Sequence, residues 1–295
     1  MSKVLVLANQ KGGVMKSTLA VNLGVGFAVR GYRTLVIDAD PQANCTYSLG
    51  VEGDQDQCLE AFVRSSRLKH SPIVSTQPLP DVTLDVLPAW ISMGLIERWP
   101  EVKTAPDPQR VADRVRALIA SRYDWVIVDG PPHLGYWNQV ALEMGDKVLI
   151  PVPQAGNYPL IGLLQMRNVI QSVQLRTNPR LRLLGVVSTF VDARTSMGRT
   201  ARERLEVFVK EPNLIFDTEI PRATAVEWSQ AHAGANLFAT AAREPVTLAI
   251  VRLMQEVEAR WQANDLAQSN YHEQAARKWN EWLLGLCRKR RLRFR

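Results

Sequence analysis

The stretch NQKGGVMKST, residues 9–18, constrains this chain most, because it directly follows the apolar run VLVLA and leads into a segment with helical spacing. A loop between a buried strand and a helix brings backbone N–H groups and the positive end of a helix dipole together, which favours a polyanion. Gly12 and Gly13 allow the main chain to fold tightly around such a group. Lys16 can reach phosphate oxygens, and the Ser17 hydroxyl can bind magnesium. The pattern predicts a loop that binds a nucleotide triphosphate.

The rest of the chain alternates short apolar runs with longer segments of helical spacing. The expected strands are residues 4–8, 34–38, 82–88, 125–129, 147–152 and 181–190. The expected helices are residues 16–30, 107–121, 157–175, 195–209 and 245–262. Apolar runs separated by helices are typical of a parallel sheet that is covered on both faces. We therefore predict an α/β fold with a mostly parallel, twisted sheet and helices on both faces. Residues 66–81, rich in serine and proline, are interpreted as a surface excursion.

Two of the expected strands end in carboxylates. The segment TLVIDADPQAN places Asp38 and Asp40 two residues apart, so that both side chains project toward the same face. The segment WVIVDGPP ends its strand with Asp129. A helix N-cap explains each aspartate when it is considered by itself. Three such groups beside one phosphate loop favour a site that holds magnesium and positions an attacking water.

The motifs KGGVMKST, DADPQAN and VIVDGPPHLG together resemble the deviant Walker A family of P-loop ATPases, and within it the ParA/Soj-type partition ATPases. The resemblance covers about residues 3–262 and includes the segments LDVLPAW, ALEMGDKVLIPV, LGVVSTFVDART and DTEIPRATAVEWSQAHAG. The related nitrogenase iron protein needs cluster-binding cysteines in the middle of the chain, and none lies between Cys58 and Cys287. These two and Cys45 form no CxxC pair, so the sequence indicates neither a zinc site nor a disulfide framework.

The resemblance implies a role for each matching residue. Lys11 resembles the signature lysine that reaches across a dimer interface to the nucleotide of the other subunit, and Asp40 resembles the residue that organises the hydrolytic water; these are the predicted catalytic residues. The predicted nucleotide-binding residues are Gly12, Gly13, Val14, Met15, Lys16, Ser17 and Thr18, with Pro221 and Arg222 packing on adenine. The predicted magnesium set is Ser17, the Walker B carboxylate Asp129, and Asp38 as support. The implied cofactors are ATP and Mg²⁺.

Met15 departs from the family pattern, which has glycine immediately before the lysine. If this position requires φ > 0, the strain on a methionine is on the order of 1–2 kcal/mol, roughly a tenfold effect on an equilibrium constant. If φ is negative, Met15 can turn outward and pack its thioether against a partner subunit. We expect the loop to bind ATP in either case and to hydrolyse it slowly.

The C-terminal tail holds the net charge of the chain. Residues 277–295 contain eight basic residues and one acid, which accounts for the whole formal charge of +7. Four apolar residues of the tail fall on one helical face, namely Trp279, Trp282, Leu283 and Leu286. Residues 271–295 could contact DNA phosphates, lie in an anionic membrane surface, or dock on the protein body. The predicted division is an ATPase domain at 1–263, followed at 264–295 by a linker, an amphipathic helix and a basic tail.

The resemblance implies an ATPase for DNA partition that forms an ATP-dependent homodimer, binds DNA nonspecifically, and is switched off when a ParB-like partner stimulates hydrolysis. Two alternatives remain open: a MinD-like positioning ATPase that cycles on a membrane, and a nucleotide-held interaction scaffold with negligible turnover. The N-terminus MSKVLVLA enters a strand without the pattern of a secretory signal. We therefore expect a cytoplasmic protein that associates with the nucleoid, with membrane association through the tail as the alternative.

Overall fold

The structure is a computed structural model that describes residues 2–64, 71–94, 106–154, 158–192, 194–195, 200–209 and 211–267. The chain divides into two compact units, residues 1–254 and 255–295; the sheet and the site described below lie in the first, and the last helix, Pro245–Ala267, runs across the division. The tail segment 271–295, with its predicted helix and basic cluster, lies outside the described residues. The predicted domain boundary after residue 263 therefore stays a prediction.

Within the described residues, eight strands form one sheet in the order β3-β4-β2-β5-β1-β6-β7-β8. The strands are β1 (Lys3–Leu7), β2 (Thr34–Asp38), β3 (Val74–Leu79), β4 (Val82–Leu87), β5 (Trp125–Asp129), β6 (Lys147–Pro153), β7 (Arg182–Val191) and β8 (Ile215–Pro221). All neighbouring strands run parallel except β3, which pairs antiparallel with β4. The predicted mostly parallel α/β sheet is confirmed.

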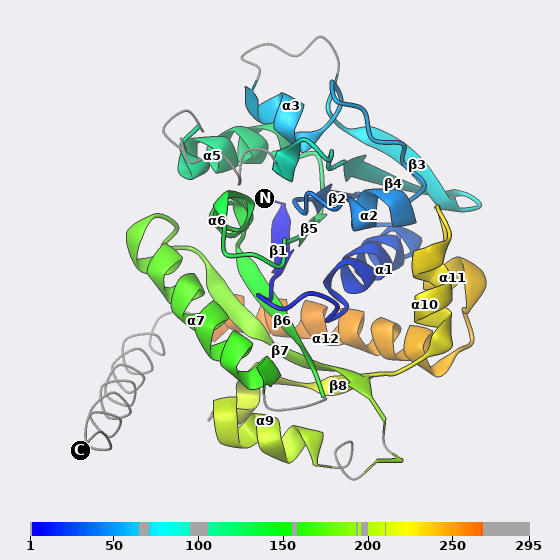
Figure 1. Ribbon diagram of the computed structural model, residues 1–295, viewed down its shortest axis with the longest axis vertical. Helices are drawn as coiled ribbons and strands as arrows, with labels where there is room; N and C mark the ends of the chain where they lie inside the picture. The colour runs from blue at the N-terminus through cyan, green and yellow to red at the C-terminus, as the bar shows by residue number, and fades with distance from the viewer. Residues whose placement is uncertain are drawn as a thin grey trace. The chain divides into compact units, whose positions relative to one another are not determined.

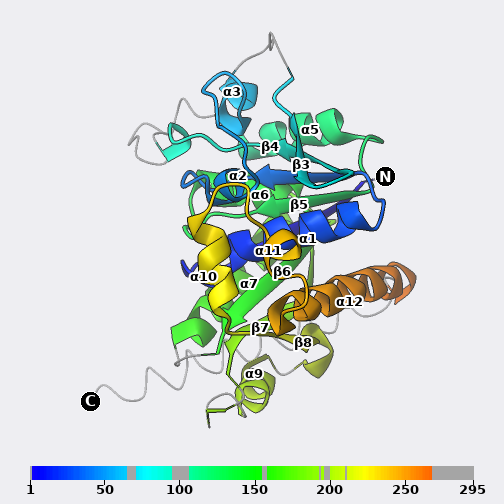
Figure 2. The same ribbon diagram turned by 90° about the vertical axis from the view of Figure 1, so that its right-hand side faces the viewer.

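Helices lie on both faces of the sheet (Figures 1 and 2). The helices of the described residues are α1 (Lys16–Val29), α2 (Asn44–Ser48), α3 (Leu59–Arg64), α5 (Pro108–Ile119), α6 (Tyr136–Met144), α7 (Tyr158–Arg176), α9 (Ala201–Val209), the 3₁₀ turn η2 (Pro212–Leu214), α10 (Thr224–Ala231), α11 (Leu237–Thr240) and α12 (Pro245–Ala267). Helix α1 packs on β1, β2, β4 and β5, and α5, α6 and α7 cover the opposite face. Helix α12 runs past the predicted end at residue 262.

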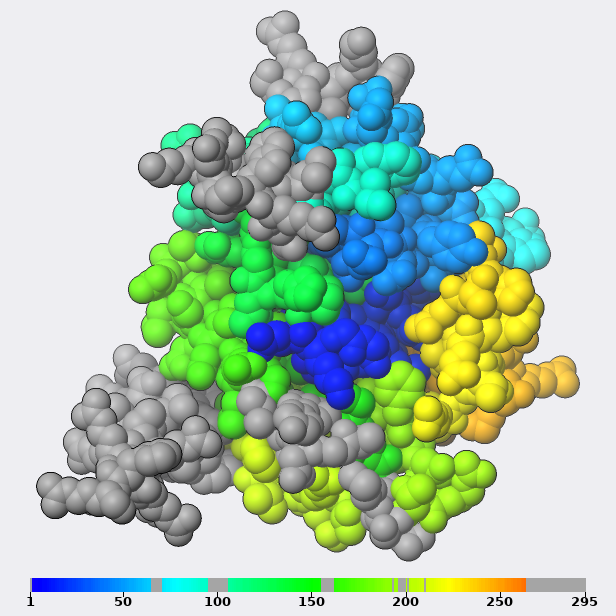
Figure 3. Space-filling view, in the orientation of Figure 1, coloured from blue at the N-terminus to red at the C-terminus, as the bar shows by residue number. Residues whose placement is uncertain are grey.

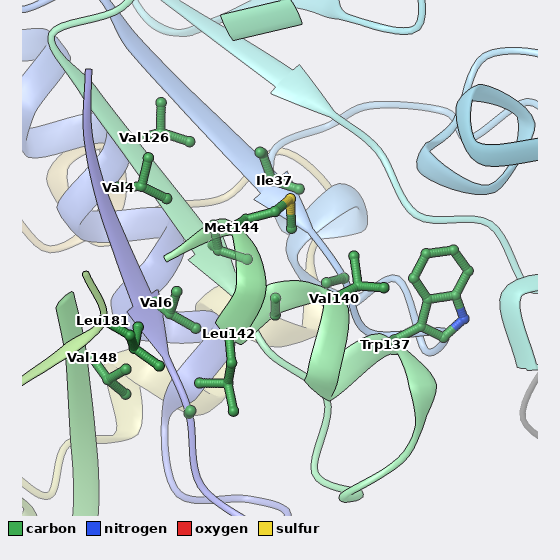
Figure 4. Packing of buried hydrophobic residues seen from close by; sticks show 14 of the residues in the cluster. Val4, Val6, Ile37, Val126, Trp137, Val140, Leu142, Met144, Val148 and Leu181 are labelled. Carbon is green, nitrogen blue, oxygen red and sulfur yellow. The ribbon is translucent and has the colours of Figure 1, made fainter. Parts of the chain in front are cut away.

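The central strands bury both of their faces because successive side chains alternate across the sheet. On one face, Val4 and Val6 of β1 pack with Val140 and Met144 of α6 in the main apolar cluster (Figure 4). Their neighbours Leu5 and Leu7 are also fully buried and point to the α1 face. This two-sided burial explains why β1, β2, β5 and β6 appear in the sequence as continuous apolar runs.

The predicted surface excursion at residues 66–81 was wrong for its second half, where β3 forms a hairpin with β4. The turn that joins the two strands contains Asp81 in a left-handed conformation, with φ 61°. Strand β3 lies at the sheet edge and is only partly buried, so it needs no continuous apolar run. Within the described part of the chain, we find no helix with both the length and the apolar character required to cross a bilayer.

Candidate nucleotide-binding site

The loop between β1 and α1 lies at the carboxyl end of the central strand, and its atoms reach the surface at the centre of the face in Figure 3. Lys11, Gly12 and Gly13 are exposed, whereas Val14 and Met15 are buried. A Cβ atom added to either glycine would meet nothing within 4 Å. The exposed half of the loop is therefore open to a ligand, and the buried half fixes the loop to the protein.

The N-terminus of α1 presents backbone donors to this loop. The N-cap residue is Met15, and among the described residues no side chain caps the helix. The first intrahelical bond runs from the Leu19 amide to the Met15 carbonyl, at 2.9 Å. The preceding amides, those of Lys16, Ser17 and Thr18, have no helical carbonyl to bind and sit at the positive end of the helix dipole. This arrangement suits a phosphate group.

Met15 adopts a left-handed conformation, with φ 74° and ψ 19°. Gly13, two residues earlier, also has positive φ, at 67°. The first of the two alternatives predicted for Met15 therefore holds, and the outward-turned thioether does not occur, because the residue is only 3% exposed. The conformation costs a methionine roughly 1–2 kcal/mol, and burial of its side chain opposes that cost.

Hydrogen bonds of two side chains, Asn9 and Thr189, hold the loop in place. The Asn9 carboxamide accepts a hydrogen bond from the Lys11 amide at 3.0 Å and donates to the Pro151 carbonyl at 2.7 Å. The Thr189 hydroxyl at the end of β7 donates to the Val14 carbonyl at 3.4 Å. The loop is thus tied to β6 and β7, the strands that follow β1 in the sheet.

Lys16 is buried beneath the loop, and its ammonium donates to the Lys11 carbonyl at 3.1 Å. Burial lowers the pKa of Lys16, while the nearby carboxylates of Asp129 and Asp40 raise it. The loop therefore contains one lysine that points into the site and another, Lys11, that is exposed to solvent.

Asp38 and Asp129 are register partners on the neighbouring parallel strands β2 and β5, as their strand-end positions predicted. Asp129 is completely buried, and neither of its carboxylate oxygens has a hydrogen-bond partner of ordinary geometry within the described chain. Burial raises the pKa of Asp129 well above its ordinary value, and Asp38 adds to this effect. The Ser17 hydroxyl lies near enough to oppose the shift. A buried carboxylate with no donor nearby except one hydroxyl is a group that a cation would stabilise.

Asp38 has its oxygens occupied. One accepts from the Asp40 amide at 3.1 Å, and the other accepts from the Thr46 amide and hydroxyl at 2.8 and 2.7 Å. Burial raises the pKa of Asp38 to about 6, against the lowering effect of these hydrogen bonds. This geometry favours a supporting role, in which Asp38 fixes Asp40 and the start of α2, over direct contact with a metal.

Asp40 follows β2 and lies near Lys16, whose charge acts on it. One of its oxygens accepts from the Gln42 amide at 3.0 Å. Burial raises the pKa of Asp40, and the Gln42 hydrogen bond, Lys16 and His133 oppose that rise. Asp40 is thus a carboxylate held beside the phosphate loop, where it could accept a hydrogen bond from a water molecule.

The described residues hold no cluster of three or more His, Cys, Asp or Glu side chains that could bind a metal by themselves. Magnesium at a phosphate loop does not need one, because it takes few protein ligands and keeps phosphate oxygens and waters. The Ser17 hydroxyl and the neighbouring buried carboxylate of Asp129 match that requirement, so these residues fit the ion.

Pro221 and Arg222 lie at the end of β8, which is the third strand from β1 in the sheet. The Arg222 amide donates to the Val191 carbonyl at 3.1 Å, which joins this segment to the end of β7. The helix that follows them, α10, does reach α1, because the Gln230 carboxamide donates to the Thr18 hydroxyl at 2.6 Å.

Sequence reasoning missed three residues that shape the site: Asn9, Thr46 and Gln230. Asn9 carried a signal, because it is the first polar residue after the β1 segment. Thr46 and Gln230 carried none, since each makes a contact that depends on how α2 and α10 pack.

The sequence is similar to that of known proteins along most of its length. A family model described as an AAA domain matches residues 2–183. The sporulation initiation inhibitor protein Soj of Bacillus subtilis is 35% identical over 236 residues, which cover 79% of this chain and 89% of Soj. The chromosome-partitioning ATPase Soj of Thermus thermophilus is 34% identical over 265 residues, 88% of this chain and 96% of that protein.

Solved structures share the fold. The cobyrinic acid a,c-diamide synthase of Mycobacterium smegmatis, solved with bound ADP and magnesium, has a TM-score of 0.69 and 28% identity, covering 90% of this chain and 97% of that chain. The cell division ATPase MinD of Pyrococcus furiosus has a TM-score of 0.69 and 22% identity, covering 88% and 99%. The fold, the phosphate loop and the sequence relatives agree: the chain belongs to the Soj/ParA family of chromosome-partitioning ATPases.

Proposed function

We propose that this chain binds ATP with Mg²⁺ in the loop of residues 11–18 and hydrolyses it to drive DNA partition. The observation that supports this most is that the free amides at the start of α1 lie beside two lysines, one buried, Lys16, and one exposed, Lys11. A relative that is 28% identical was solved with ADP and magnesium.

Lys11 is the residue through which ATP would join two copies of the chain. Its exposed side chain can reach a phosphate held by a second copy, whereas Lys16 is buried beneath its own loop and would serve the phosphate bound there. A ligand that binds only the closed pair shifts the equilibrium toward it, so ATP would stabilise the homodimer. Negative charge on the two facing nucleotides is offset when each Lys11 enters the opposite site.

For hydrolysis, Asp40 would accept a hydrogen bond from the attacking water and orient it, while Lys16 and Lys11 donate to the phosphate oxygens. Ser17 and Asp129 would hold magnesium, which neutralises phosphate charge when it is bound. Asp38 would keep Asp40 in position through the Asp40 amide. We infer slow turnover, tuned by the buried, left-handed Met15.

The role that we propose in the cell is the one expected for a member of this family. The ATP-bound homodimer would bind DNA nonspecifically through phosphate contacts, and a ParB-like centromere-binding partner would stimulate hydrolysis and release it. The protein would then be cytoplasmic and associated with the nucleoid. The ATPase domain would span residues 1–263, and the linker and tail 264–295 would add basic charge to the DNA contact.

The test compares two lysine variants. Lys16→Ala should abolish nucleotide binding in calorimetry, because the phosphates lose their buried cation. Lys11→Ala should still bind nucleotide but should stay monomeric in light scattering with ATP and Mg²⁺, whereas the unchanged protein dimerises. Normal dimerisation of Lys11→Ala would refute the cross-subunit role, and the absence of nucleotide binding by the folded, unchanged protein at millimolar ATP would refute the whole proposal.

A further inference from the structure

Helix α10 joins the segment proposed to hold the base to the helix proposed to hold the phosphates. It begins at Thr224, two residues after Arg222, and ends at Ala231 after eight residues. An isolated helix shorter than about 12–15 residues is marginal in water. The position of α10, and of the segment that enters it, therefore depends on tertiary contacts.

Helix α10 packs on α11 and α2, and hydrogen bonds join this part of the chain to α1 and α2. On the α1 side, the Gln230 carboxamide donates to the Thr18 hydroxyl at 2.6 Å, across 212 residues of sequence. On the α2 side, the Tyr47 hydroxyl donates to the Ala231 carbonyl at a longer 3.4 Å, and the Gly234 amide donates to the Tyr47 carbonyl at 3.2 Å. The Gln230 bond is the shortest of these.

Thr18 is well placed to transmit such a contact. It lies in the first turn of α1, one residue after Ser17, and is only 5% exposed. Its backbone amide belongs to the donors that face the loop, and its side chain is turned away from them toward Gln230. One residue thus contacts the proposed phosphate site with its backbone and α10 with its side chain.

We propose that Gln230 is a positioning residue that couples recognition of the base to the phosphate loop. This inference rests on the proposed function. When the bond is present, the segment at 221–222 is held at a fixed distance from the phosphate-binding amides before the nucleotide arrives. When it is broken, that segment must be ordered at the moment of binding, so the base contributes less to affinity.

The coupling predicts that affinity is lost for ligands that carry a base and kept for those that do not. Without the Gln230 bond, affinity for a complete nucleotide should fall about two- to tenfold, the range expected for one neutral hydrogen bond. Affinity for inorganic tripolyphosphate, which has no base, should change by less than about twofold, because the loop itself is unaltered. A bond that only stabilised the packing of α10 would lower the melting temperature and leave the ratio of these affinities unchanged.

The experiment measures binding of AMPPNP and of tripolyphosphate, each with Mg²⁺, by calorimetry on the full chain. Gln230→Leu removes the donor at similar size, and Gln230→Asn, which keeps an amide that is too short, serves if the first variant does not fold. Tyr47→Phe is the matched control, because it removes the weaker anchor of the same helix. Adding Gln230→Leu to Thr18→Val should have no further effect on the affinity ratio.

A drop in the affinity ratio for Gln230→Leu and not for Tyr47→Phe would support the inference. Equal losses for both ligands, or an unchanged ratio, would overturn it while leaving the proposed function intact. If the unchanged protein bound neither AMPPNP nor tripolyphosphate, the proposed function would fail and this inference with it.

Discussion

Replacement of Met15 tests whether strain in the phosphate loop is real and what it does. The residue combines two opposing contributions, a left-handed backbone with φ 74° and a side chain that is 3% exposed. The backbone conformation costs a residue with a Cβ roughly 1–2 kcal/mol relative to glycine. Removal of a buried methionine side chain costs about 2–5 kcal/mol, because transfer free energy is lost and a cavity is left.

These magnitudes predict that Met15→Gly destabilises the fold, since packing outweighs strain. The informative comparison is with Met15→Ala, which loses nearly the same packing but keeps the Cβ. Glycine relieves the strain, which raises the free energy of unfolding by about 1–2 kcal/mol. Its greater backbone freedom in the unfolded chain lowers that free energy by about 0.5–1 kcal/mol. Met15→Gly should therefore be more stable than Met15→Ala by roughly 0.5 kcal/mol, although its side chain is smaller.

The assay is urea denaturation of the three proteins, followed by phosphate release at saturating ATP. Strain that is equal in the free and the bound protein cancels from the affinity, so the stability comparison isolates it better than a binding constant does. We expect Met15→Gly to release phosphate faster than the unchanged protein. If Met15→Ala proved as stable as Met15→Gly, or more stable, the backbone strain at this position would be refuted. If the unchanged protein and Met15→Gly released phosphate at the same rate, Met15 would have no influence on turnover.

Two further predictions concern the aspartates. Asp40→Ala should bind nucleotide, lose hydrolysis and remain on DNA as a dimer. The fraction of protein held on DNA should fall steeply as the salt concentration rises. Continued phosphate release by this variant would contradict the role assigned to Asp40. Burial raises the pKa of Asp38 to about 6, so the stability it contributes is complete below the ordinary pKa near 4 and is lost as the pH rises through 6. Asp38→Asn, which does not titrate, should therefore differ from the unchanged protein in unfolding free energy by an amount that changes by roughly 2 kcal/mol between pH 4 and 7, measured by denaturant titration without nucleotide; a difference independent of pH would falsify the burial argument.

The parts of the fold that the sequence predicted are those that follow from burial alone. Strands β2 and β5 match their expected bounds because a strand covered on both faces must be apolar throughout. Strand β3 was missed because an edge strand is half exposed and tolerates Pro78 and polar residues. The short helices α2 and α10 were missed because so few residues give no helical period, and their stability depends on neighbours.

Some features of the site were likewise predictable from the sequence, and others were not. Asp38 and Asp129 were expected together because the carboxyl ends of parallel strands meet at one edge, and the register confirms it. The sign of φ at Met15 could not be predicted, because it depends on how the loop closes over β6 and β7 rather than on the residue itself. The bond between Gln230 and Thr18 joins positions 212 residues apart and leaves no pattern in the sequence.

The irregular pairing of β3 makes this edge of the sheet a poor template for a further strand. The register shifts between Thr76 and Leu79, and Pro78 within that interval has no N–H to offer a further strand. The Pro78 carbonyl is already occupied by the Asn236 carboxamide at 3.0 Å. An incoming chain therefore meets an interrupted row of donors and acceptors at this border of the sheet, which disfavours fibril-like stacking of one copy beside another.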